Sequence, residues 1–570
     1  MGIGKTNKAP VKGTRQEGKT LMTTKNTIKK ALAALAAGAL LGGVLAGCGA
    51  STAAEGSGSD STSTAAYNPV SVSGTAPGGD LIPTNSQESG KKTLVWQLFD
   101  GLVDVDPDTR KVRNEVAKSI TSDDQQTWTI TLNQDRKFSD GTPVKADNFI
   151  KAWTWGADIA NAQIASGDLA VIKGYDKLHP SDGSKATATE FEGLKKVDDY
   201  TFTVELTSPY SSFVNLLTSV TFYPLPDSFF KDPDAWRKNP VGNGPYKLRQ
   251  AVDEATGAYF DLNKYYKGNR TPHNTGLYVR FYTDSSAAYQ DVLADNLDIT
   301  SPGGADLLTA KDDFGDRLVE PVITGPNTTI TFPMWDDFWK SSNGLKVRQA
   351  ISLAINREEI VDKVFNGYAV PAKDFTVKGL NGWSDSIKGS DVLDFNVTKA
   401  KALLKEAGGY TKELPIYYNA DGAHKQWVEA VANQIKKNLG INAVPKPTTT
   451  FSDFLQKRAD HQFTGPWRAS EIPFNPGLDD MLRNVYSTSG SANSGSEWTS
   501  DAFEAKLKEG WQQKDTDAAN EKFNEAQEIL FQDLPAIPLW YTKIPSVYST
   551  KVSNVHTNVF GSTLYLVEKK

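Results

Sequence analysis

Apolar and polar residues alternate with a period of two in two stretches of the first half of the chain. Residues 128–132 read Trp-Thr-Ile-Thr-Leu, and residues 202–206 read Phe-Thr-Val-Glu-Leu. Because successive side chains of a strand point to opposite faces, this alternation predicts two strands that each bury one face.

A period of three to four residues appears in the second half of the chain and predicts helices. Apolar residues recur at this spacing over 347–355, 400–407, 428–435 and 523–531. Gly408 and Gly440 follow two of these stretches and predict their C-terminal ends. The sequence from Asn356 to Glu359 predicts the capped start of a further helix. Strands and helices are mixed, and no short-period repeat occurs, so the pattern favours an α/β or α+β fold.

A secretory signal is predicted near the N-terminus. Lys25, Lys29 and Lys30 precede an apolar stretch at 31–44, and small residues follow it. A basic segment, a short apolar segment and a small-residue cleavage site are the parts of a signal peptide. The stretch is shorter than the about 20 residues that a membrane span needs. Met22 opens a more typical signal than Met1 and is an alternative start.

The only cysteine, Cys48, ends the sequence Leu45-Ala-Gly-Cys. This sequence resembles the lipobox of bacterial lipoproteins, in which the cysteine is lipidated and becomes the first mature residue. The alternative is an ordinary secretory signal with a chance cysteine. Residues 49–66 are mostly Ser, Thr, Ala and Gly, which predicts a flexible tether. We therefore expect residues 1–47 to be removed and the mature protein to be anchored outside the cell membrane through Cys48, as in Gram-positive bacteria.

Charge and composition limit the partners. Residues 1–47 hold eight basic residues and one acidic residue, so the remaining 54 basic and 67 acidic residues give a net charge of −13. An acidic chain argues against nucleic acid as a partner. With no cysteine after Cys48, disulfides cannot stabilise the fold, which must rest on hydrophobic cores in two or more domains.

The sequence gives no positive support for an enzyme, a metal site or a cofactor. The five histidines are scattered, and neither a His-Glu-x-x-His nor a Gly-x-Ser-x-Gly pattern occurs. The acidic pairs are expected to be solvated or to cap local turns rather than to act in catalysis. These pairs are Asp123/Asp124, Asp336/Asp337 and Asp479/Asp480.

Several long stretches, in order, resemble the dipeptide/oligopeptide-binding family of solute-binding proteins from bacterial ABC importers. They are Leu98-Phe-Asp-Gly-Leu-Val-Asp-Val-Asp-Pro107, residues 128–132, Lys137-Phe-Ser-Asp-Gly-Thr-Pro-Val-Lys-Ala-Asp147, Pro240-Val-Gly-Asn-Gly-Pro-Tyr-Lys-Leu248, residues 347–360 and residues 399–408. The resemblance extends from about residue 67 to the C-terminus, and the combination is far more specific than any one stretch.

The resemblance implies an α/β, two-lobed, periplasmic-binding-protein-like fold with an extra subdomain in lobe I and hinge closure over the ligand. By analogy with the family, lobe I takes residues 67–110, 235–325 and 541–570. The inserted subdomain takes 111–234, and lobe II takes 326–540. Closure is a population shift, since a ligand that contacts both lobes favours the closed state.

The family's site is transferred one residue at a time. Asp100 and Gly101 match the lobe I segment that approaches the ligand, and turn capping is the alternative role of Asp100. Asn419 and His424 lie in a stretch that resembles the one where oligopeptide binders have a pocket histidine. The alternative for His424 is a surface position at a helix start. Phe451 matches an aromatic wall position, or else a core position.

Residues 465–471, Gly-Pro-Trp-Arg-Ala-Ser-Glu, match the stretch where the family usually reads Arg-Ala-Gly-Trp. Trp467 and Arg468 belong to it, and Arg468 fits an arginine whose planar fork can bind a peptide carboxylate. A surface ion pair is the alternative. The chain then departs from the family: a gapless alignment puts Phe474 at the aspartate that pairs with the ligand amine, and Glu471 at an aromatic position. Either Glu471 supplies the carboxylate, or the amine is not held there.

These features predict the extracytoplasmic binding component of a peptide importer. Its expected partners are an oligopeptide or similar elongated ligand, the permease subunits and the membrane, and we expect a monomer. The same fold binding an oligosaccharide or another elongated solute is the first alternative, motivated by Phe474 and the aromatic content. A surface sensor or adhesin is the second, and a secreted hydrolase is the least supported.

Overall fold

The computed structural model describes residues 67–86, 88–321, 323–488 and 495–570. Met22, the predicted signal peptide, the lipidation site Cys48 and the predicted tether lie outside the described residues. Within the described residues, no helix combines the length and the apolar character that crossing a membrane requires.

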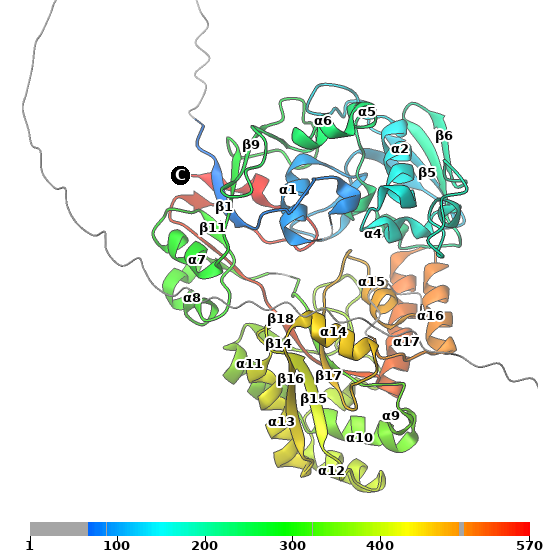
Figure 1. The fold of residues 1–570 in the computed structure, drawn as a ribbon, viewed down its shortest axis with the longest axis vertical. Coiled ribbons are helices and arrows are strands. Elements are labelled where there is room, and N and C mark those ends of the chain that lie inside the picture. The colour runs from blue at the N-terminus through cyan, green and yellow to red at the C-terminus, as the bar shows by residue number, and fades with distance from the viewer. Residues whose placement is uncertain (1–66, 87, 322, 489–494) are drawn as a thin grey trace, which may run out of the picture. The chain divides into compact units, whose positions relative to one another are not determined.

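A seven-stranded sheet joins segments from both ends of the described chain (Figure 1). Its strands, in spatial order, are β12 (Leu318–Val319), β19 (Ser546–Tyr548), β11 (Ile299–Thr300), β1 (Val70–Gly74), β10 (Leu277–Phe281), β9 (Gly257–Leu262) and β8 (Tyr246–Leu248). β1 pairs in parallel with β10, whereas β19 pairs antiparallel with β11. The C-terminal segment therefore returns to the sheet that the first strand begins.

A four-stranded antiparallel sheet is built from the intervening sequence. Its order is β4 (Ala117–Thr121), β5 (Thr127–Leu132), β7 (Thr201–Glu205) and β6 (Leu194–Asp198). β5 and β7 confirm the two strands predicted from alternation: Trp128, Ile130 and Leu132 are buried while the threonines between them are exposed or half-buried. The buried faces pack on α2 (Ala146–Ala157), whose Trp153 lies at 5.8 Å from Phe202 between ring centroids.

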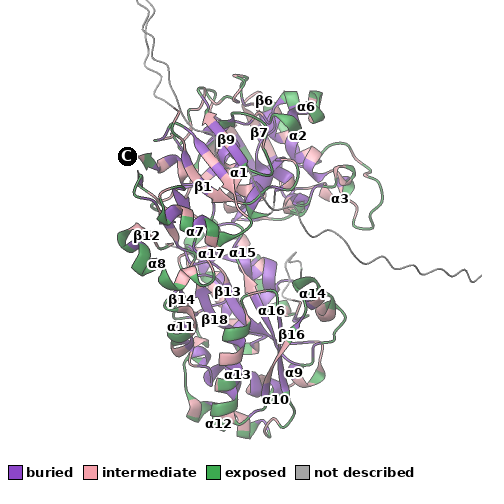
Figure 2. Cartoon of the chain, turned by 60° about the vertical axis from the view of Figure 1, so that its left-hand side comes forward, coloured by how far each residue is buried: buried purple, intermediate pink, exposed green. Residues whose placement is uncertain are grey.

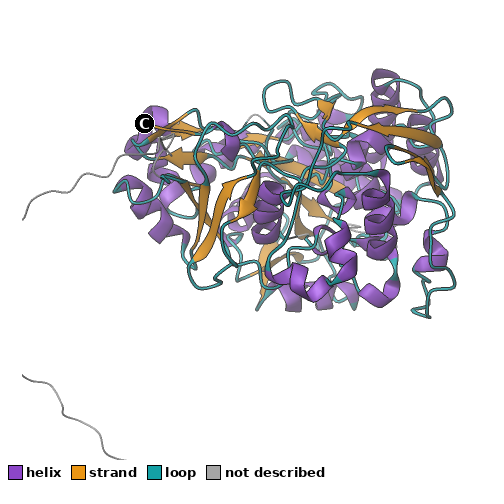
Figure 3. Cartoon of the chain, turned by 90° about the horizontal axis from the view of Figure 1, so that it is seen from above, coloured by secondary structure: helices purple, strands orange, loops and turns teal. Residues whose placement is uncertain are grey.

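A six-stranded sheet forms the other large layer. Its order is β14 (Ala369–Pro371), β18 (Ala536–Thr542), β13 (Asn327–Thr331), β17 (Trp467–Glu471), β15 (Leu414–Asn419) and β16 (Ala443–Thr448). β13 and β18 are almost wholly buried, while α12 (Val397–Glu406) and α13 (Lys425–Leu439) turn exposed residues outward (Figure 2). Viewed from above, strands and helices are interspersed, as the predicted mixed class requires (Figure 3).

The predicted helices are confirmed, and so are the signals at their ends. They are α10 (Ser342–Leu353), α11 (Arg357–Phe365), α12 (Val397–Glu406), α13 (Lys425–Leu439) and α17 (Thr516–Asp533). The Asn356 side chain accepts a hydrogen bond from the Glu359 backbone N–H at 3.1 Å and so caps α11. Gly440 ends α13 with φ of 73°, a backbone conformation that suits glycine.

The other strands and α-helices are short or connect these layers. They are β2 (Val103–Val105), β3 (Val112–Asn114), β20 (Val552–Ser553), β21 (Glu568–Lys569), α1 (Ser89–Leu98), α3 (Tyr175–Leu178), α4 (Phe213–Leu216), α5 (Asp227–Lys231), α6 (Pro233–Lys238), α7 (Ser285–Leu293), α8 (Asp306–Phe314), α9 (Asp337–Lys340), α14 (Phe451–Ala459), α15 (Asp479–Met481) and α16 (Asp501–Trp511).

An ion pair is buried where α1 ends. The Arg270 Nε donates to Asp100 Oδ1 at 2.7 Å, and the Nη2 donates to the same oxygen and to the Phe99 carbonyl. The Nη1 donates to the Trp96 carbonyl at 2.5 Å. The Arg270 guanidinium thus holds two carbonyls at the C-terminal end of α1 together with the Asp100 side chain.

Replacing Arg270 by Met should destabilise the protein by about 3–5 kcal/mol, because Asp100 would keep its burial and lose its cation. Urea unfolding followed by tryptophan fluorescence measures the loss. Lys399→Met is the control, since it removes an exposed ion pair with Asp391 (2.8 Å) of a kind that contributes about 0–1 kcal/mol. Equal losses in the two variants would contradict this account of the buried pair.

Candidate functional site

Strand β17 presents a buried guanidinium next to the end of strand β15. Only 9% of Arg468 is exposed. Its Nε donates to Asn419 Oδ1 at 2.8 Å, and its Nη2 donates to the same oxygen. Within the described residues, no carboxylate lies at ion-pairing distance from Arg468. Burial lowers the pKa of Arg468, although Glu471 and Asp421 partly offset this. The group is a buried cation bonded to a neutral amide.

Helix α14 covers Arg468 from one side. The guanidinium carbon lies 4.8 Å from the ring centroid of Phe451 and 5.1 Å from that of Phe454. The Phe451 backbone N–H donates to Asp421 Oδ2 at 3.0 Å, and Asn419 Nδ2 donates to the other oxygen at 2.5 Å. Asp421 therefore fixes the start of α14 against the end of β15. Phe451 keeps 44% of its surface exposed, so it can offer an aromatic face to a ligand.

His424 lies at the start of α13 and belongs to the same group. The Trp427 indole N–H donates to His424 Nδ1 at 3.3 Å. Burial lowers the pKa of His424 to about 4, and the positive charge of Arg468 adds to this effect. The imidazole is therefore neutral at pH 7. The structure thus brings together Asn419, His424, Phe451 and Arg468, four of the predicted site residues.

Glu471 ends β17 as a half-buried carboxylate. Burial raises the pKa of Glu471 to about 7, and the charges of Arg458 and Arg468 only partly counteract it. In the described part of the chain, Glu471 forms no ion pair within 4.0 Å. A cation brought near Glu471 would stabilise its charged form.

Three predicted site residues, Asp100, Gly101 and Trp467, are buried in this structure. Trp467 is fully buried and stacks on Trp335 with 5.3 Å between ring centroids, so it offers a ligand no exposed surface. Asp100 is 2% exposed and pairs with Arg270. A Cβ added to Gly101 would lie 2.6 Å from the Tyr223 ring, which explains the need for glycine there.

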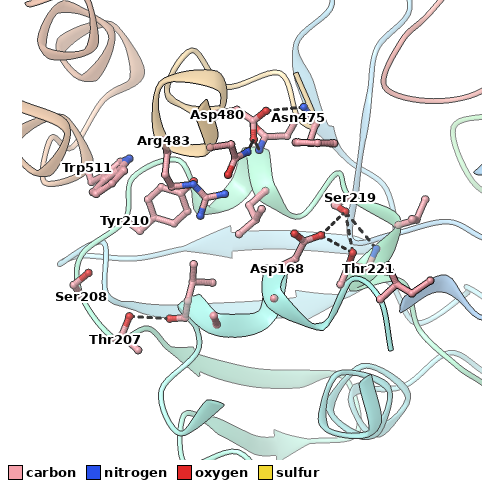
Figure 4. A pocket seen from close by; sticks show the side chains of 18 of the residues that line it. Asp168, Thr207, Ser208, Tyr210, Ser219, Thr221, Asn475, Asp480, Arg483 and Trp511 are labelled. Atoms are coloured by element: carbon pink, nitrogen blue, oxygen red, sulfur yellow. Dashed lines mark hydrogen bonds between the residues drawn. The ribbon is translucent and has the colours of Figure 1, made fainter. Parts of the chain in front are cut away.

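A cavity of about 570 Å³ opens beside the loop that follows β17 (Figure 4). Phe474 is the only predicted site residue among its lining residues, and it is 47% exposed. The Phe474 backbone N–H donates to Asp480 Oδ2 at 2.6 Å. The residues that line the cavity come from three segments, 164–171, 207–221 and 474–484. Lys92 of α1 and Trp511 of α16 also line it.

Comparison with known proteins decides the family. Residues 111–527 match the family model described as bacterial extracellular solute-binding proteins, family 5. The chain belongs to this family. Most of its length is matched, so membership does not rest on a single motif.

The chain aligns with most of the length of its curated relatives. The periplasmic murein peptide-binding protein MppA of Escherichia coli is 25% identical over 83% of this chain and 89% of the relative. The oligopeptide-binding protein OppA of Bacillus subtilis is 24% identical over 81% of this chain and 85% of the relative. The probable deoxycholate-binding periplasmic protein YgiS of Escherichia coli is 25% identical over 86% and 91%.

Solved structures agree on the fold. The unliganded open form of MppA superimposes with a TM-score of 0.76 at 22% identity, covering 89% of this chain and 98% of that structure. OppA of Listeria monocytogenes bound to peptide gives 0.65 at 21% identity, covering 89% and 99%. The solute-binding protein therefore has the two-lobed, periplasmic-binding-protein-like fold that the sequence resemblance implied.

One expectation about acidic pairs is wrong. Asp124 and Asp336 hold local turns or cap a helix, as expected. Asp479 and Asp480 are instead at most 1% exposed. Asp480 accepts hydrogen bonds from the Phe474 backbone and from Asn475 and Asn484, and burial raises the pKa of Asp480 to about 7. Local sequence did not reveal this, because the burial comes from packing against residues more than 200 positions away, such as Tyr210.

Lys92, Asp168 and Arg483 were missed for the same reason. They line the cavity from three segments that are distant in sequence, and none of them lies in a recognisable motif. Among the described residues, no group of His, Cys, Asp and Glu side chains is arranged to hold a metal ion.

Glu471 should make stability depend on pH. In the folded state the pKa of Glu471 is about 7, whereas its ordinary value is 4.5. Between pH 4.5 and pH 7 the folded state therefore binds a proton that the unfolded state has lost, and stability falls as the pH rises through this range. Glu471→Gln removes this loss and should be more stable than the wild type at pH 8 by about 2–3 kcal/mol, with little difference at pH 4. Thermal unfolding at both pH values measures it, with Glu521→Gln on the exposed side of α17 as the control. A gap of equal size at both pH values would contradict the assignment.

Proposed function

We propose that this protein is the extracytoplasmic binding component of an ABC importer and that it captures oligopeptides. Family membership supports a solute-binding role, and relatives such as OppA and MppA are named for peptide cargo. The names of the relatives differ in cargo, since YgiS is named as a probable deoxycholate-binding protein. The choice of peptide depends on the chemistry of β17.

The observation that supports peptide most directly is the open edge of β17 next to Arg468. All five residues of β17 pair with β13 on one side. On the other side, β15 pairs with β17 only at Trp467, so the backbone of Ala469 to Glu471 has no strand partner there within the described residues. An extended peptide can add to such an edge through main-chain hydrogen bonds.

Arg468 supplies the charge that a peptide needs. A buried guanidinium without an anion is costly, and a ligand carboxylate would recover that cost through paired hydrogen bonds. Glu471, three residues along the same strand, is a carboxylate without a described ion pair and can attract an ammonium group. An extended edge with a cation and an anion suits a peptide better than an uncharged sugar.

The remaining parts of the proposal concern the domain organisation of the protein and its location in the cell. Lobe I would comprise 67–110, 235–325 and 541–570, the inserted subdomain 111–234 and lobe II 326–540, with hinge closure over the ligand. We also propose a lipid anchor at Cys48 in the cell membrane, delivery to permease subunits and a monomeric state. The lipobox-like sequence and the tether composition support the anchor.

Peptide capture is tested by a thermal-shift screen of ligand-free protein with a diverse peptide pool and an oligosaccharide pool. A peptide at about 100 times its Kd should stabilise the wild type by about 2.7 kcal/mol. Arg468→Met should lower peptide affinity by about tenfold or more, because the ligand carboxylate loses a charged partner. Lys457→Met is the control: it removes a cation of α14 that pairs with Asp453 at 3.0 Å. A shift with sugars and none with peptides would refute the proposal.

The anchor is tested separately. Cys48→Ser should move the protein from the membrane fraction to the medium of its native host, since no acyl chain could be attached. Fractionation followed by intact-mass measurement of the wild type checks both the location and the added lipid mass. A Cys48→Ser protein that stays in the membrane fraction would contradict the proposed anchor.

A further inference from the structure

The cavity beside Phe474 contains two cationic side chains that make no described hydrogen bond or ion pair. Lys92 projects from α1, and its Nζ lies 5.7 Å from the centroid of the Phe474 ring. Arg483 also lines the cavity, with its guanidinium carbon 5.8 Å from the centroid of the Tyr210 ring (Figure 4). Within the described residues, neither side chain makes a hydrogen bond or an ion pair, and the Arg483 Nε is shielded from solvent.

The two carboxylates that line the cavity are already committed to neutral donors. Asp480 Oδ2 accepts from the Phe474 N–H, and Oδ1 accepts from the side-chain amides of Asn475 and Asn484. Asp168 Oδ2 accepts from the hydroxyl of Thr221 at 2.7 Å and from that of Ser219 at 3.3 Å. The lining therefore holds two cations and two carboxylates, and among the described residues no ion pair within 4.0 Å joins them.

Burial of Asp480 favours a net positive charge in the cavity near neutral pH, although Tyr210 and the nearby aspartates raise the pKa of Arg483 and so stabilise its cation. The raised pKa of Asp480, about 7, means that part of its population is uncharged at pH 7. Burial also lowers the pKa of Lys92, which reflects an ammonium removed from water and only distantly compensated by Asp168 and Asp480. An anion entering the cavity would relieve that penalty.

We propose, on the basis of the peptide cargo proposed above, that this cavity binds an acidic side chain of the peptide through Lys92 and Arg483. The cavity volume of about 570 Å³ leaves room for such a side chain. Phe474 contributes an apolar wall under the Lys92 ammonium, which holds that cation in the cavity. Specificity for an acidic peptide then comes from residues of α1 and of the segment after α15, rather than from β17.

The test compares matched peptides. Alanine-based tetrapeptides with Glu or Gln at each position in turn are titrated calorimetrically into the wild type. At one position Glu should bind about tenfold more tightly than Gln. Lys92→Met and Arg483→Met should each bring that ratio close to one, mainly by weakening binding of the Glu peptide. A cooperative thermal unfolding transition shows that each variant is folded.

Two further variants sharpen the test. Lys151→Met is the matched control, because the Lys151 ammonium also lies over a phenylalanine ring (5.9 Å from the Phe230 centroid) but outside the cavity. It should keep the wild-type ratio. Asp168→Asn removes a negative charge from the lining and should raise the affinity for the Glu peptide, whereas it would lower affinity if the cavity held a cation.

The outcomes separate this inference from the proposed function. Tetrapeptides that bind with equal affinity whether they contain Glu or Gln would overturn the acidic subsite and leave peptide capture intact. Preference for Glu that survives both Lys92→Met and Arg483→Met would also overturn it. If no tetrapeptide and no member of the peptide pool binds the wild type, the proposed function itself fails.

Discussion

A guanidinium ion that folding removes from water must find acceptors, and much of this structure depends on how that requirement is met. Arg348 donates to the carbonyls of Trp339, Asp533 and Leu534 and so connects α9 and α10 to the end of α17. Arg357 donates to carbonyls of Pro538 and Leu393 and connects α11 to β18. Burial lowers the pKa of both groups, but the surrounding carbonyl oxygens hold them in place.

Against this background, Arg468 and Arg483 stand out. The structural arginines reach several carbonyls or a carboxylate, whereas Arg468 reaches one neutral amide oxygen and Arg483 has no described hydrogen bond. Both lie on surfaces where a ligand can approach, one beside an open strand edge and the other at a cavity. The same physical requirement that fixes the core therefore supports the two ligand sites proposed above.

Sequence reasoning succeeded where the signal was local. Helices α12 and α13 follow from apolar spacing and a terminal glycine, because both features act within a few turns of the chain. The group around Arg468 could be proposed because Asn419, His424 and Phe451 occur in recognisable stretches. Trp467 shows the limit: its place in a matching stretch did not reveal that its ring is stacked inside the core on Trp335.

The sequence by itself determined the mixed α/β class, the absence of disulfides in the folded body and the resemblance that led to the family, and it predicted a secretory signal that ends at the lone Cys48. These depend on periodicity, composition and continuous motifs. Only the tertiary structure decided that Asp100 is bound to Arg270, that Asp480 is buried, and that Lys92 and Arg483 share a cavity. Those outcomes depend on contacts between segments separated by more than a hundred residues. The burial and the charge environment of each residue are then set by both segments together, so neither segment reveals them alone.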